Sequence, residues 1–560
     1  MARIYKLDIK NFRGIKEFSY TFDDLHLICL VGRGDTGKST ILSAISYVLY
    51  PKWNPSFYDT DFYNCNTDNP VEIEATLVNV PEILLTEDKY GLYIRGINKE
   101  TGEIKDEIED EHEKALTIKL EVKKDLEPKW YIINGRKDVP IVISANDRAK
   151  LNTFIISDYL DVHFQWSKGS PLYSLLKQED NIDVFEKDSI LTDVMREAKN
   201  KIDGYQFNQF ENVIKILKSK VKELGVGLPE VSNSIDFKDI SIKEGKISLH
   251  EGKIPFRLKG KGTKRLMSIA IQLALVESGG IILIDEIEQG LEPDRIKHLV
   301  RTLYKNNKGQ IFIATHSQNV IEELDVENIL IVENLNGALR CKRCDGKFQD
   351  VIRACPEAAY AKKVIVCEGK TEIGICCALN DFRIKESKPN LSEVDTVYIL
   401  GGGNNFVDRA LKLKELSLEV CVFCDSDVER MNERKDELKQ KGINVFDWDV
   451  ENSTEQQVFN DLPWEAIKEL IEYLEAQLPE ASVRNSLNSR MQGELTGNWK
   501  ENDTVEIRKA LAEAAKNSNW FKRIDHGKFL GKIIFKHFDY IKDKTLGKRL
   551  EDLSNWIDNE

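Results

Sequence analysis

The chain has 560 residues, of which 41% are hydrophobic and 31% are charged, and its formal net charge is −14. Its length suits three or four domains of roughly 150 residues, each with its own core. The acidic balance argues against nonspecific nucleic-acid binding by the whole surface. No apolar run approaches the roughly 20 residues that cross a bilayer, and the start has no signal-peptide segment, so we expect a cytoplasmic protein without a membrane partner.

Residues 25–50 read LHLICLVGRGDTGKSTILSAISYVLY, which is an apolar strand, a glycine-rich turn and an apolar helix. The turn is a GxxxxGKS sequence in the setting of a phosphate-binding loop. Its glycines let amide groups point at phosphate oxygens, Lys38 neutralises the β and γ phosphates, and the Ser39 hydroxyl ligates Mg²⁺. The sequence therefore predicts an ATP site built from Gly32, Gly34, Gly37, Lys38, Ser39 and Thr40.

About 250 residues separate this loop from the next nucleotide motif. They begin with strand-like segments and continue with a helical region at about residues 165–245. The strongest helix pattern there starts at residue 210 and predicts either packing on the chain's own core or a dimer contact. Its apolar face consists of Phe210, Ile214, Leu217, Val221 and Leu224.

Residues 257–265, RLKGKGTKR, carry five positive and no negative side chains. Gly260 and Gly262 lie within this segment and precede a helix with apolar periodicity. The basic segment is either a solvated face or a contact for the phosphate backbone of a nucleic acid.

Two later strands end at polar residues that suit nucleotide hydrolysis. The apolar run 281–284 delivers Asp285 as the metal-side carboxylate, with Glu286 beside it to polarise the attacking water. The strand in GQIFIATHSQNVI ends at His316, the position of a γ-phosphate sensor.

The order of these motifs, with the opening IYKLDIKNFRGIKEFSYTF, resembles the ABC-type ATPase heads of the chromosome-maintenance and recombination group. The resemblance implies an ABC-type P-loop domain over residues 1–355, with a mixed sheet and a helical insertion. In such ATPases the turn that corresponds to Gly260 and Gly262 contacts the γ-phosphate of a partner protomer, which implies a dimer or a higher oligomer. Gly34 stands where the family usually has Asn, and Ile287 where it usually has Pro, but neither change removes a phosphate or metal ligand.

After residue 355 strands and helices alternate again, which predicts a small parallel sheet. The chemistry of such sheets gathers at the strand C-terminal ends, where the sequence places Glu368, the glycines 401–403, Asp425 and Asp427. Glu372 follows in the first turn of the next helix. Mg²⁺ or Mn²⁺ would neutralise these mutually repelling carboxylates and polarise a phosphodiester. For any single residue, an exposed acidic loop is the simpler alternative.

Ten cysteines are scattered along the chain, several of them inside apolar strands or helices. We expect small buried hydrophobic side chains in the reduced state rather than a disulfide framework. Cys341 with Cys344 and Cys421 with Cys424 have CxxC spacing, but neither pair is accompanied by a second pair or by suitably spaced histidines, which argues against zinc.

Residues 356–560 resemble the Toprim domain of topoisomerases, bacterial primases and recombination nucleases. An ABC-type head followed by Toprim resembles the overcoming-lysogenization-defect (OLD) family of ATP-dependent nucleases, on the ordered motifs GRGDTGKST, LIDEIEQ, ATHS, CEGKTE and CDSD. The resemblance implies that Glu368, Glu372, Asp425 and Asp427 are metal ligands. It also implies a further acid, for which Glu455 is our choice and Glu451 the alternative, and a C-terminal lysine, for which we choose Lys528; ordinary helix surface is the alternative for each.

The leading prediction is an ATP-binding, divalent-metal-dependent DNA endonuclease whose cleavage is gated by nucleotide state. The basic tail 521–550, with nine Lys or Arg against three Asp, would contact DNA. The resemblance implies bacterial anti-phage defence, with a helicase-like protein or a retron reverse transcriptase and its DNA as a partner. Two alternatives stay open: an ATPase sensor or scaffold whose second domain cuts tRNA or is regulatory, and a topoisomerase with a tyrosine nucleophile.

Overall fold

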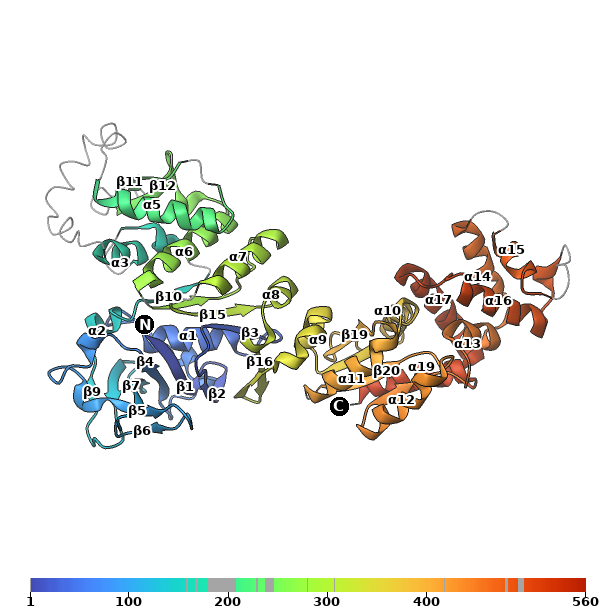
Figure 1. Ribbon diagram of the computed structural model, residues 1–560, viewed down its shortest axis with the longest axis horizontal. Helices are drawn as coiled ribbons and strands as arrows, with labels where there is room; N and C mark the ends of the chain where they lie inside the picture. The colour runs from blue at the N-terminus through green and yellow to red at the C-terminus, as the bar shows by residue number, and fades with distance from the viewer. Residues whose placement is uncertain are drawn as a thin grey trace. The chain divides into compact units, whose positions relative to one another are not determined.

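The computed structural model describes residues 2–157, 160–166, 170–178, 208–227, 230–236, 246–278, 280–306, 308–416, 418–478, 482–491 and 498–559. The chain divides into two compact units, Met1–Gly346 and Lys347–Glu560 (Figure 1). The division falls slightly before the predicted boundary at residue 355, because α9 (Gln349–Ala354) is tied to the second unit by the ion pair of Asp350 with Lys412 at 2.8 Å.

The first unit is built on a mixed sheet of 14 strands. Its strand order is β10-β14-β15-β3-β16-β17-β2-β1-β4-β7-β5-β6, with β8 and β9 beyond β7. The strands are β1 Arg3–Phe12, β2 Ile15–Thr21, β3 Leu27–Val31, β4 Val71–Val78, β5 Arg95–Asn98, β6 Ile104–Lys105, β7 His112–Val122, β8 Pro128–Ile133, β9 Ile141–Val142, β10 Thr153–Ile156, β14 Ile281–Ile284, β15 Gln310–Thr315, β16 Ile329–Leu335 and β17 Ala338–Arg343. The predicted α/β architecture with a mixed sheet is confirmed.

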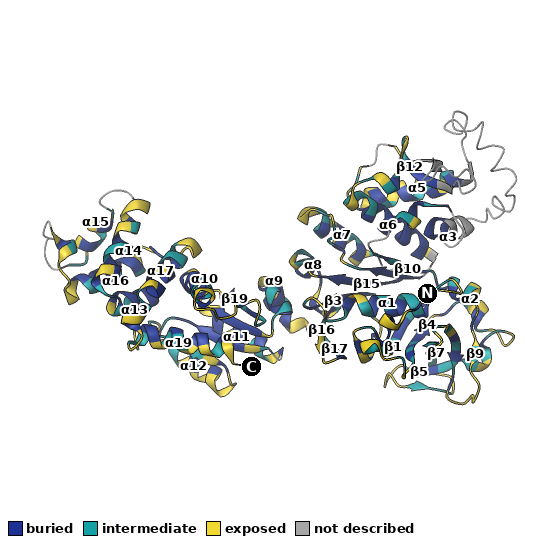
Figure 2. Cartoon of the chain, turned by 180° about the vertical axis from the view of Figure 1, so that it is seen from behind, coloured by how far each residue is buried: buried dark blue, intermediate teal, exposed yellow. Residues whose placement is uncertain are grey.

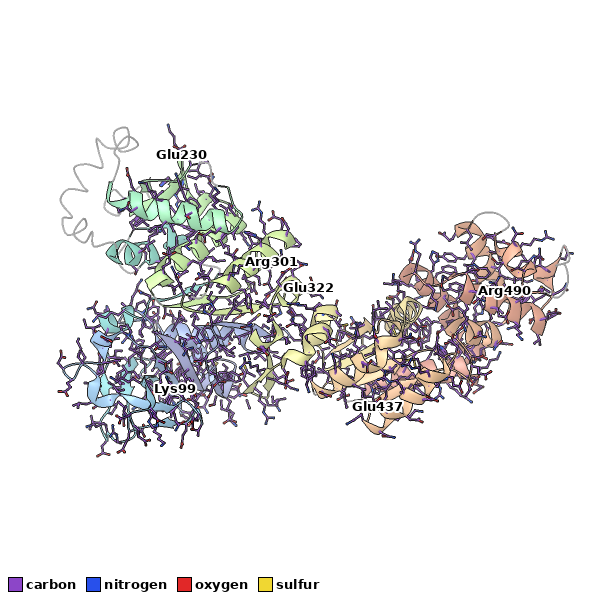
Figure 3. All side chains as sticks on the ribbon, viewed as in Figure 1. Lys99, Glu230, Arg301, Glu322, Glu437 and Arg490 are labelled. Atoms are coloured by element: carbon purple, nitrogen blue, oxygen red, sulfur yellow. The ribbon has the colours of Figure 1, made fainter. Side chains whose placement is uncertain are left out.

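The nucleotide motifs lie on the parallel part of this sheet. Strands β14, β15 and β3 are adjacent, parallel and buried along their whole length, as expected for continuous apolar runs covered on both faces (Figure 2). Their carboxyl ends therefore meet at one edge, where the P-loop and the residues after β14 and β15 come together. The helices of the unit are α1 Lys38–Val48, α2 Ala145–Ala149, α3 Pro171–Gln178, α5 Asn208–Glu223, α6 Lys261–Leu275, α7 Pro293–Lys305 and α8 Gln318–Glu323. Helices α7 and α8 pack together, and Lys297 is paired with Glu322 at 2.7 Å. Figure 3 labels Arg301 on α7 and Glu322 on α8.

Helix α5 represents the predicted helical insertion, most of whose remaining residues, 179–207 and 237–245, lie outside the described part of the chain. It packs against α6, and the Phe210 ring stacks on Trp166 with centroids 4.3 Å apart. The buried face includes Val213, while Ile214 is only half-buried. The structure thus shows this helix packed on the chain's own core, and a dimer contact stays a prediction. A second sheet in this region consists of β11 Ser232–Asp236, β12 Lys246–Glu251 and β13 Ile254–Pro255.

The second unit contains a four-stranded parallel sheet in the order β19-β18-β20-β21, which agrees with the predicted small parallel sheet. Its strands are β18 Lys363–Cys367, β19 Thr396–Leu400, β20 Glu419–Phe423 and β21 Asn444–Phe446. Besides α9, its helices are α10 Lys370–Lys385, α11 Phe406–Glu415, α12 Glu429–Gln440, α13 Thr454–Asp461, α14 Trp464–Gln477, α15 Ser482–Asn488, α16 Val505–Asn517, α17 Ile524–Lys536, α18 Phe538–Ile541 and α19 Thr545–Asp558. One large apolar core joins the sheet to the C-terminal helices.

Helices α10 and α17 lie side by side and run parallel. A Cβ atom placed on Gly374 would lie 2.3 Å from the carbonyl carbon of Gly527, and one placed on Gly531 would lie 2.6 Å from Ala378 Cβ. The two backbones are therefore in direct contact. Further along, the Phe382 and Phe535 rings stack at 4.9 Å.

All ten cysteines are free thiols. Across the residues that the structure describes, we find no helix that is both long enough and apolar enough to span a membrane.

Candidate functional site

The P-loop joins β3 to α1. Gly37 caps α1 with φ of 94°, a left-handed conformation that favours glycine, and its missing side chain leaves room for Leu339. The Lys38 amine is buried and donates to the carbonyl oxygens of Gly32 at 2.7 Å and Arg33 at 2.6 Å. The Lys38 amine is thus folded back onto carbonyl oxygens of its own loop, and a bound triphosphate would compete with these oxygens for the amine.

Ser39 and Asp285 meet across the sheet edge. The Ser39 hydroxyl donates to Asp285 Oδ1 at 2.8 Å, so the two residues predicted to serve Mg²⁺ lie together. Burial lowers the pKa of Lys38 to about 8, against the opposing pull of nearby carboxylates that include Asp285 and Glu288. Glu286 is exposed and has φ of 49°, a strained backbone conformation of the kind found at functional sites.

Glu288 is a residue that the sequence reasoning missed. Its carboxylate accepts a hydrogen bond from the Thr315 hydroxyl at 2.7 Å and another from the backbone N–H of His316 at 2.7 Å. It therefore fixes the turn that presents the exposed His316 side chain. A third acid in the run DEIEQ was the only sequence signal for it.

The two glycines before α6 differ in their surroundings. A Cβ on Gly262 would lie 2.3 Å from the carbonyl oxygen of Gly290, whereas Gly260, like Gly34, has no atom of the described chain within 4 Å of that position. Gly262 therefore serves a close approach inside the chain, and Gly260 leaves an open surface at the start of α6. In the basic segment 257–265, three cations are bound internally: Lys259 to Glu251 at 2.5 Å, Lys264 to Asp161 at 3.3 Å and Arg265 to Gln289 at 2.9 Å.

The second site lies at the carboxyl edge of the sheet in the second unit. Glu368 follows β18, and its Oε2 atom accepts from the backbone N–H of Asp425 at 3.0 Å. Glu372, in the first turn of α10, accepts from the N–H of Gly369 at 2.9 Å. The glycines after β19 fold over the same edge, with the Gly403 N–H donating to the Glu368 carbonyl at 3.0 Å.

Thr454, a second missed residue, joins two of these carboxylates. Its hydroxyl oxygen lies 2.7 Å from Glu372 Oε1 and 2.6 Å from Asp425 Oδ1, and it accepts from the Trp448 indole at 2.8 Å. One hydroxyl proton cannot serve both acids, which favours keeping a proton on the pair. Burial and the neighbouring carboxylates raise the pKa of Glu372 to about 7 and raise the pKa of Asp425 well above its usual range.

Of the two candidates for a further acid, only Glu455 is enclosed at this edge. It lies in the first turn of α13, is 1% exposed, and neither carboxylate oxygen has a hydrogen-bond partner among the described residues. Glu451 is instead exposed, in a turn with φ of 72°. Asp427 is paired with Lys516 at 2.7 Å, at the rim of the cluster.

The predicted lysine, Lys528, is paired with an acid further along α10. The Lys528 amine lies 2.9 Å from Asp381, which follows Glu372 by nine residues, about 13 Å along α10. Two other lysines lie near the carboxylates. The Lys435 amine donates to the Asp425 carbonyl oxygen at 2.6 Å. Burial lowers the pKa of Lys522, but the charges of Glu455, Asp425, Glu372 and Glu368 raise it by more. A hydrogen bond of 3.0 Å from the Thr371 hydroxyl to the Phe521 carbonyl holds this turn against the start of α10.

The donor set fits a divalent cation. Among the described residues, no three acidic, His or Cys side chains are yet arranged as a metal cage, since Thr454 and backbone N–H groups occupy several oxygens. However, a buried carboxylate with both oxygens free, beside acids whose pKa values are raised by burial and mutual repulsion, matches the hard oxygen ligands of Mg²⁺ and Mn²⁺. Glu368, Glu372, Asp425 and Glu455 are the residues placed to supply them.

Comparison with known proteins identifies the first unit. Residues 27–322 match the family model described as "AAA domain, putative AbiEii toxin, Type IV TA system". Among curated proteins, no sequence matches the chain.

Several solved structures are similar to the chain. An Smc head domain of Pyrococcus furiosus, bound to the C-terminal domain of ScpA, has 15% identity and a TM-score of 0.39, and covers 63% of this chain and 98% of its own. The SMC head domain of Thermotoga maritima has 16% identity and a TM-score of 0.30, and covers 61% and 99%. The recombination mediator protein RecF has 14% identity and a TM-score of 0.35, and covers 61% and 98%.

The matched segment includes the P-loop, Asp285 and His316, and it covers more than half of the chain. The first unit is thus an ATP-binding ATPase domain of the ABC/AAA type, and the chain belongs to the AAA-domain family described as putative AbiEii toxin, Type IV TA system.

Proposed function

We propose that the protein is a divalent-metal-dependent DNA endonuclease of OLD type, with a Toprim domain at residues 356–560 and cleavage controlled by the nucleotide bound to its ATPase unit. One observation carries the proposal. Glu455 is buried beside Glu372 and Asp425 with both carboxylate oxygens unpartnered among the described residues. Enclosing so many like charges is costly unless a cation is bound.

Each residue at this edge has a distinct task. Glu368, Glu372, Asp425 and Glu455 would hold Mg²⁺ or Mn²⁺, which when bound supplies polarisation of the phosphodiester and activation of water. Thr454 orients two of the carboxylates. Lys522, whose pKa is raised by the carboxylates of this edge, would stabilise the negative charge that develops on the phosphate.

The ATPase unit supplies the control. Lys38 would exchange its carbonyl partners for the β and γ phosphates of ATP, and Ser39 with Asp285 would hold Mg²⁺. Glu286 would polarise the attacking water and His316 would sense the γ-phosphate, on a turn held by Glu288. The open surface at Gly260 suits contact with the nucleotide of a second copy, so we propose a homodimer or a higher oligomer.

In a cell this activity would serve anti-phage defence in bacteria, with a helicase-like protein or a retron reverse transcriptase and its DNA as a partner. The matched family is described as a putative toxin of a type IV toxin–antitoxin system, and a nuclease released from control would inhibit growth. Cleavage of tRNA, in place of DNA, is the second candidate.

Purified protein incubated with supercoiled plasmid, or with tRNA, and Mg²⁺ or Mn²⁺ tests the proposal. We expect the wild type to nick or linearise plasmid, and Asp425→Ala, Glu368→Ala and Lys522→Ala to lose at least 100-fold in rate. Glu451→Ala, an exposed acid in the same region, is the matched control and should keep full activity.

The outcomes separate the readings. Cleaved tRNA with intact plasmid selects the RNA-directed alternative, and relaxed closed circles select a topoisomerase. If wild type and variants leave both substrates equally intact, the second unit is not a nuclease and the scaffold reading replaces it.

A further inference from the structure

A surface cavity at the far end of α10 and α17 has no part in the site described above. Its volume is about 430 Å³, within the roughly 300–1,000 Å³ of small-molecule sites. A second hollow of about 630 Å³ shares part of its wall, including Phe382, Glu386 and Phe535. Helix α10 carries Glu372 in its first turn and reaches these hollows in its last turn.

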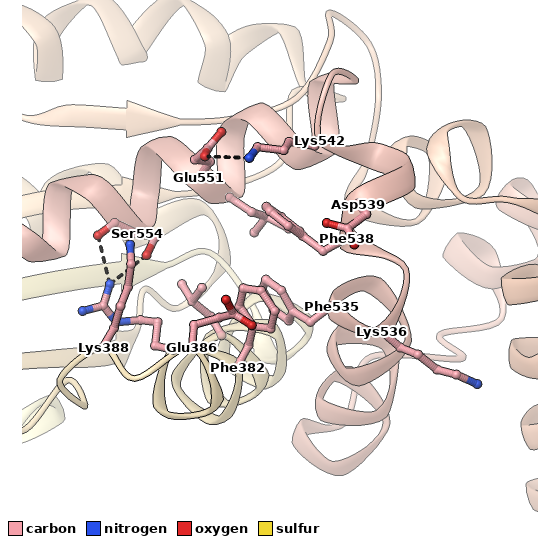
Figure 4. Close-up of a pocket in the computed structure, with 13 residues that line it drawn as sticks. Phe382, Glu386, Lys388, Phe535, Lys536, Phe538, Asp539, Lys542, Glu551 and Ser554 are labelled. Atoms are coloured by element: carbon pink, nitrogen blue, oxygen red, sulfur yellow. Dashed lines mark hydrogen bonds and ion pairs between the residues drawn. The ribbon is translucent and has the colours of Figure 1, made fainter.

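Aromatic side chains form the centre of the smaller cavity. Phe382 stacks on Phe535 at 4.9 Å, and Phe538 lies 5.4 Å from Phe382, so three rings are in mutual contact (Figure 4). Phe382 and Phe538 are only partly buried, and both line the cavity. Such rings provide a stacking platform for a planar ligand.

Two carboxylates border these rings. Neither Glu386 nor Asp539 has an ion-pair or hydrogen-bond partner for its side chain among the described residues, and both lie beside the rings in the close-up (Figure 4). The Lys536 amine points away from the cavity and is paired with Glu469 at 2.7 Å. The cavity therefore offers hydrogen-bond acceptors beside an aromatic face, which suits a base with an exocyclic amino group.

The larger hollow has positively charged side chains in its lining, in addition to the carboxylates of the smaller cavity. Lys385, the last residue of α10, and Lys532 of α17 both line it, and both are exposed without a carboxylate partner in the described chain. The other lysine at its edge, Lys536, is already neutralised. An anion is the ligand that two unpaired ammonium groups would take.

We propose that this double hollow binds one nucleotide of a single-stranded nucleic acid, with its base against Phe382 and Phe538 and its phosphate on Lys385 and Lys532. A nucleotide joins a planar base with amino donors to an anionic phosphate, in the same combination as the two hollows. The inference rests on the proposed function, because the strand bound here is the one that the carboxylate edge cuts.

The position of the hollow predicts which nucleotide it holds. Thirteen residues separate Glu372 from Lys385, which corresponds to about 20 Å along α10. A stacked strand rises about 3.4 Å per nucleotide, so the bound nucleotide lies about six positions from the cut, and fewer if the strand is stretched. The hollow would hold the strand while the distant edge acts.

Binding of a fluorescent 20-nucleotide single strand to the full chain, measured by anisotropy in EDTA over a range of salt, tests this. We expect Lys385→Ala/Lys532→Ala to weaken binding at least fivefold and to make the salt dependence shallower by about 0.7 for each lost phosphate contact. Phe538→Leu, which keeps an apolar side chain but loses the aromatic face, should weaken binding at least fivefold with the salt dependence unchanged.

Lys439→Ala/Lys441→Ala is the matched control, since it removes the same charge from two exposed lysines at the end of α12, the helix that carries Glu437 in Figure 3. It should bind within twofold of the wild type. Thermal melts of all variants check that each is folded.

Three results would overturn the inference. The control variant could lose as much affinity as the Lys385 variant, the Lys385 and Phe538 variants could bind as well as the wild type, or the wild type could prefer duplex to single-stranded nucleic acid. If the wild type still cuts plasmid in that case, the proposed function stands without it. If the wild type neither binds nor cuts any nucleic acid, both fail.

Discussion

The proposed metal site depends most on one buried carboxylate, that of Glu455. Glu455 has no partner for either oxygen in the described chain, although Lys522 lies near enough to feel its charge. Removing that charge should therefore stabilise the metal-free protein, because an unpaired buried charge costs more than a neutral amide.

We expect Glu455→Gln to raise the melting temperature of the second unit in EDTA by about 2–8 °C, since a gain of about 1–2 kcal/mol shifts a unit of this size by about 2–4 °C per kcal/mol. Addition of Mn²⁺ should stabilise the wild type but not the variant. Differential scanning calorimetry measures both shifts, with Glu451→Gln as the exposed control. A lower melting temperature for Glu455→Gln in EDTA would show that the carboxylate is already satisfied.

His163 gives the first unit a pH dependence. Burial lowers the pKa of His163 to about 4 from its ordinary value of 6.5. Between these two pH values His163 is protonated in the unfolded chain but neutral in the folded chain. Its contribution to the free energy of unfolding is therefore fully present above pH 6.5 and is lost as the pH falls toward 4.

At pH 5 the loss attributable to His163 is about 2 kcal/mol, at about 1.4 kcal/mol per unit. We expect the free energy of unfolding, measured with urea, to fall between pH 7.5 and pH 5 by about 2 kcal/mol less in His163→Leu than in the wild type. His298→Leu, at an exposed position, should follow the wild type. Identical pH profiles for all three proteins would rule out the buried neutral histidine.

At the scale of elements, the contact of α10 with α17 holds the carboxylate edge together. These helices touch through glycines, and a Cβ on Gly374 would meet the backbone of Gly527 at 2.3 Å. Gly374→Ala should therefore force the helices apart and cost about 3 kcal/mol, at the upper end of overpacking.

Chemical denaturation of the second unit measures that cost. Gly14→Ala is a control in the first unit: no described atom lies within 4 Å of the new carbon, so it should be nearly neutral there and should leave the unfolding of the second unit unchanged. Under the proposed function, Gly374→Ala should also lower nuclease activity below its melting temperature, because Lys522 directly precedes α17 and would move with it. A stable and active Gly374→Ala protein would contradict the direct contact between the two helix backbones.

The sequence predicted well what is local in the chain. The strand, glycine turn and helix around Lys38 are contiguous, as are the apolar run before Asp285 and those before Glu368 and Asp425, so the strand ends could be placed from pattern alone. Because neighbouring strands in each sheet are parallel, the residues that follow them lie together at the carboxyl edge of that sheet.

What could not be predicted depends on packing between distant segments. Thr454 and Glu288 bond to residues that lie tens of positions away, and neither type signals such a task by itself. Lys528 and Lys522 belong to one basic tail, and only the direction of α17 along α10 decides which of them faces the acids. The function assigned to these residues stays a proposal.

At the scale of the whole molecule, two units with separate cores should respond separately to their ligands. ATP at 100 times its dissociation constant stabilises the state that binds it by about 2.7 kcal/mol. We expect calorimetry to show two transitions, of which only that of the first unit rises with ATP, by several degrees.

Lys38→Ala should abolish this shift and leave the transition of the second unit unchanged, because its contacts lie in the P-loop. Mn²⁺ should move the other transition instead. A single transition that responds to both ligands would show that the units unfold together.

The contact of α10 with α17 joins segments that are synthesised at different times. Helix α10 is made first, and α17 follows about 140 residues later. Glu368, Glu372, Asp425 and Glu455 are synthesised before Lys522 and α17, so the carboxylate edge lacks the charge of Lys522 until that later segment has been made. Products of premature termination would lack the lysine and the helix that supports it. Under the proposed function, such products would have an ATPase unit but no active nuclease, because Lys522 and α17 would be missing from the carboxylate edge.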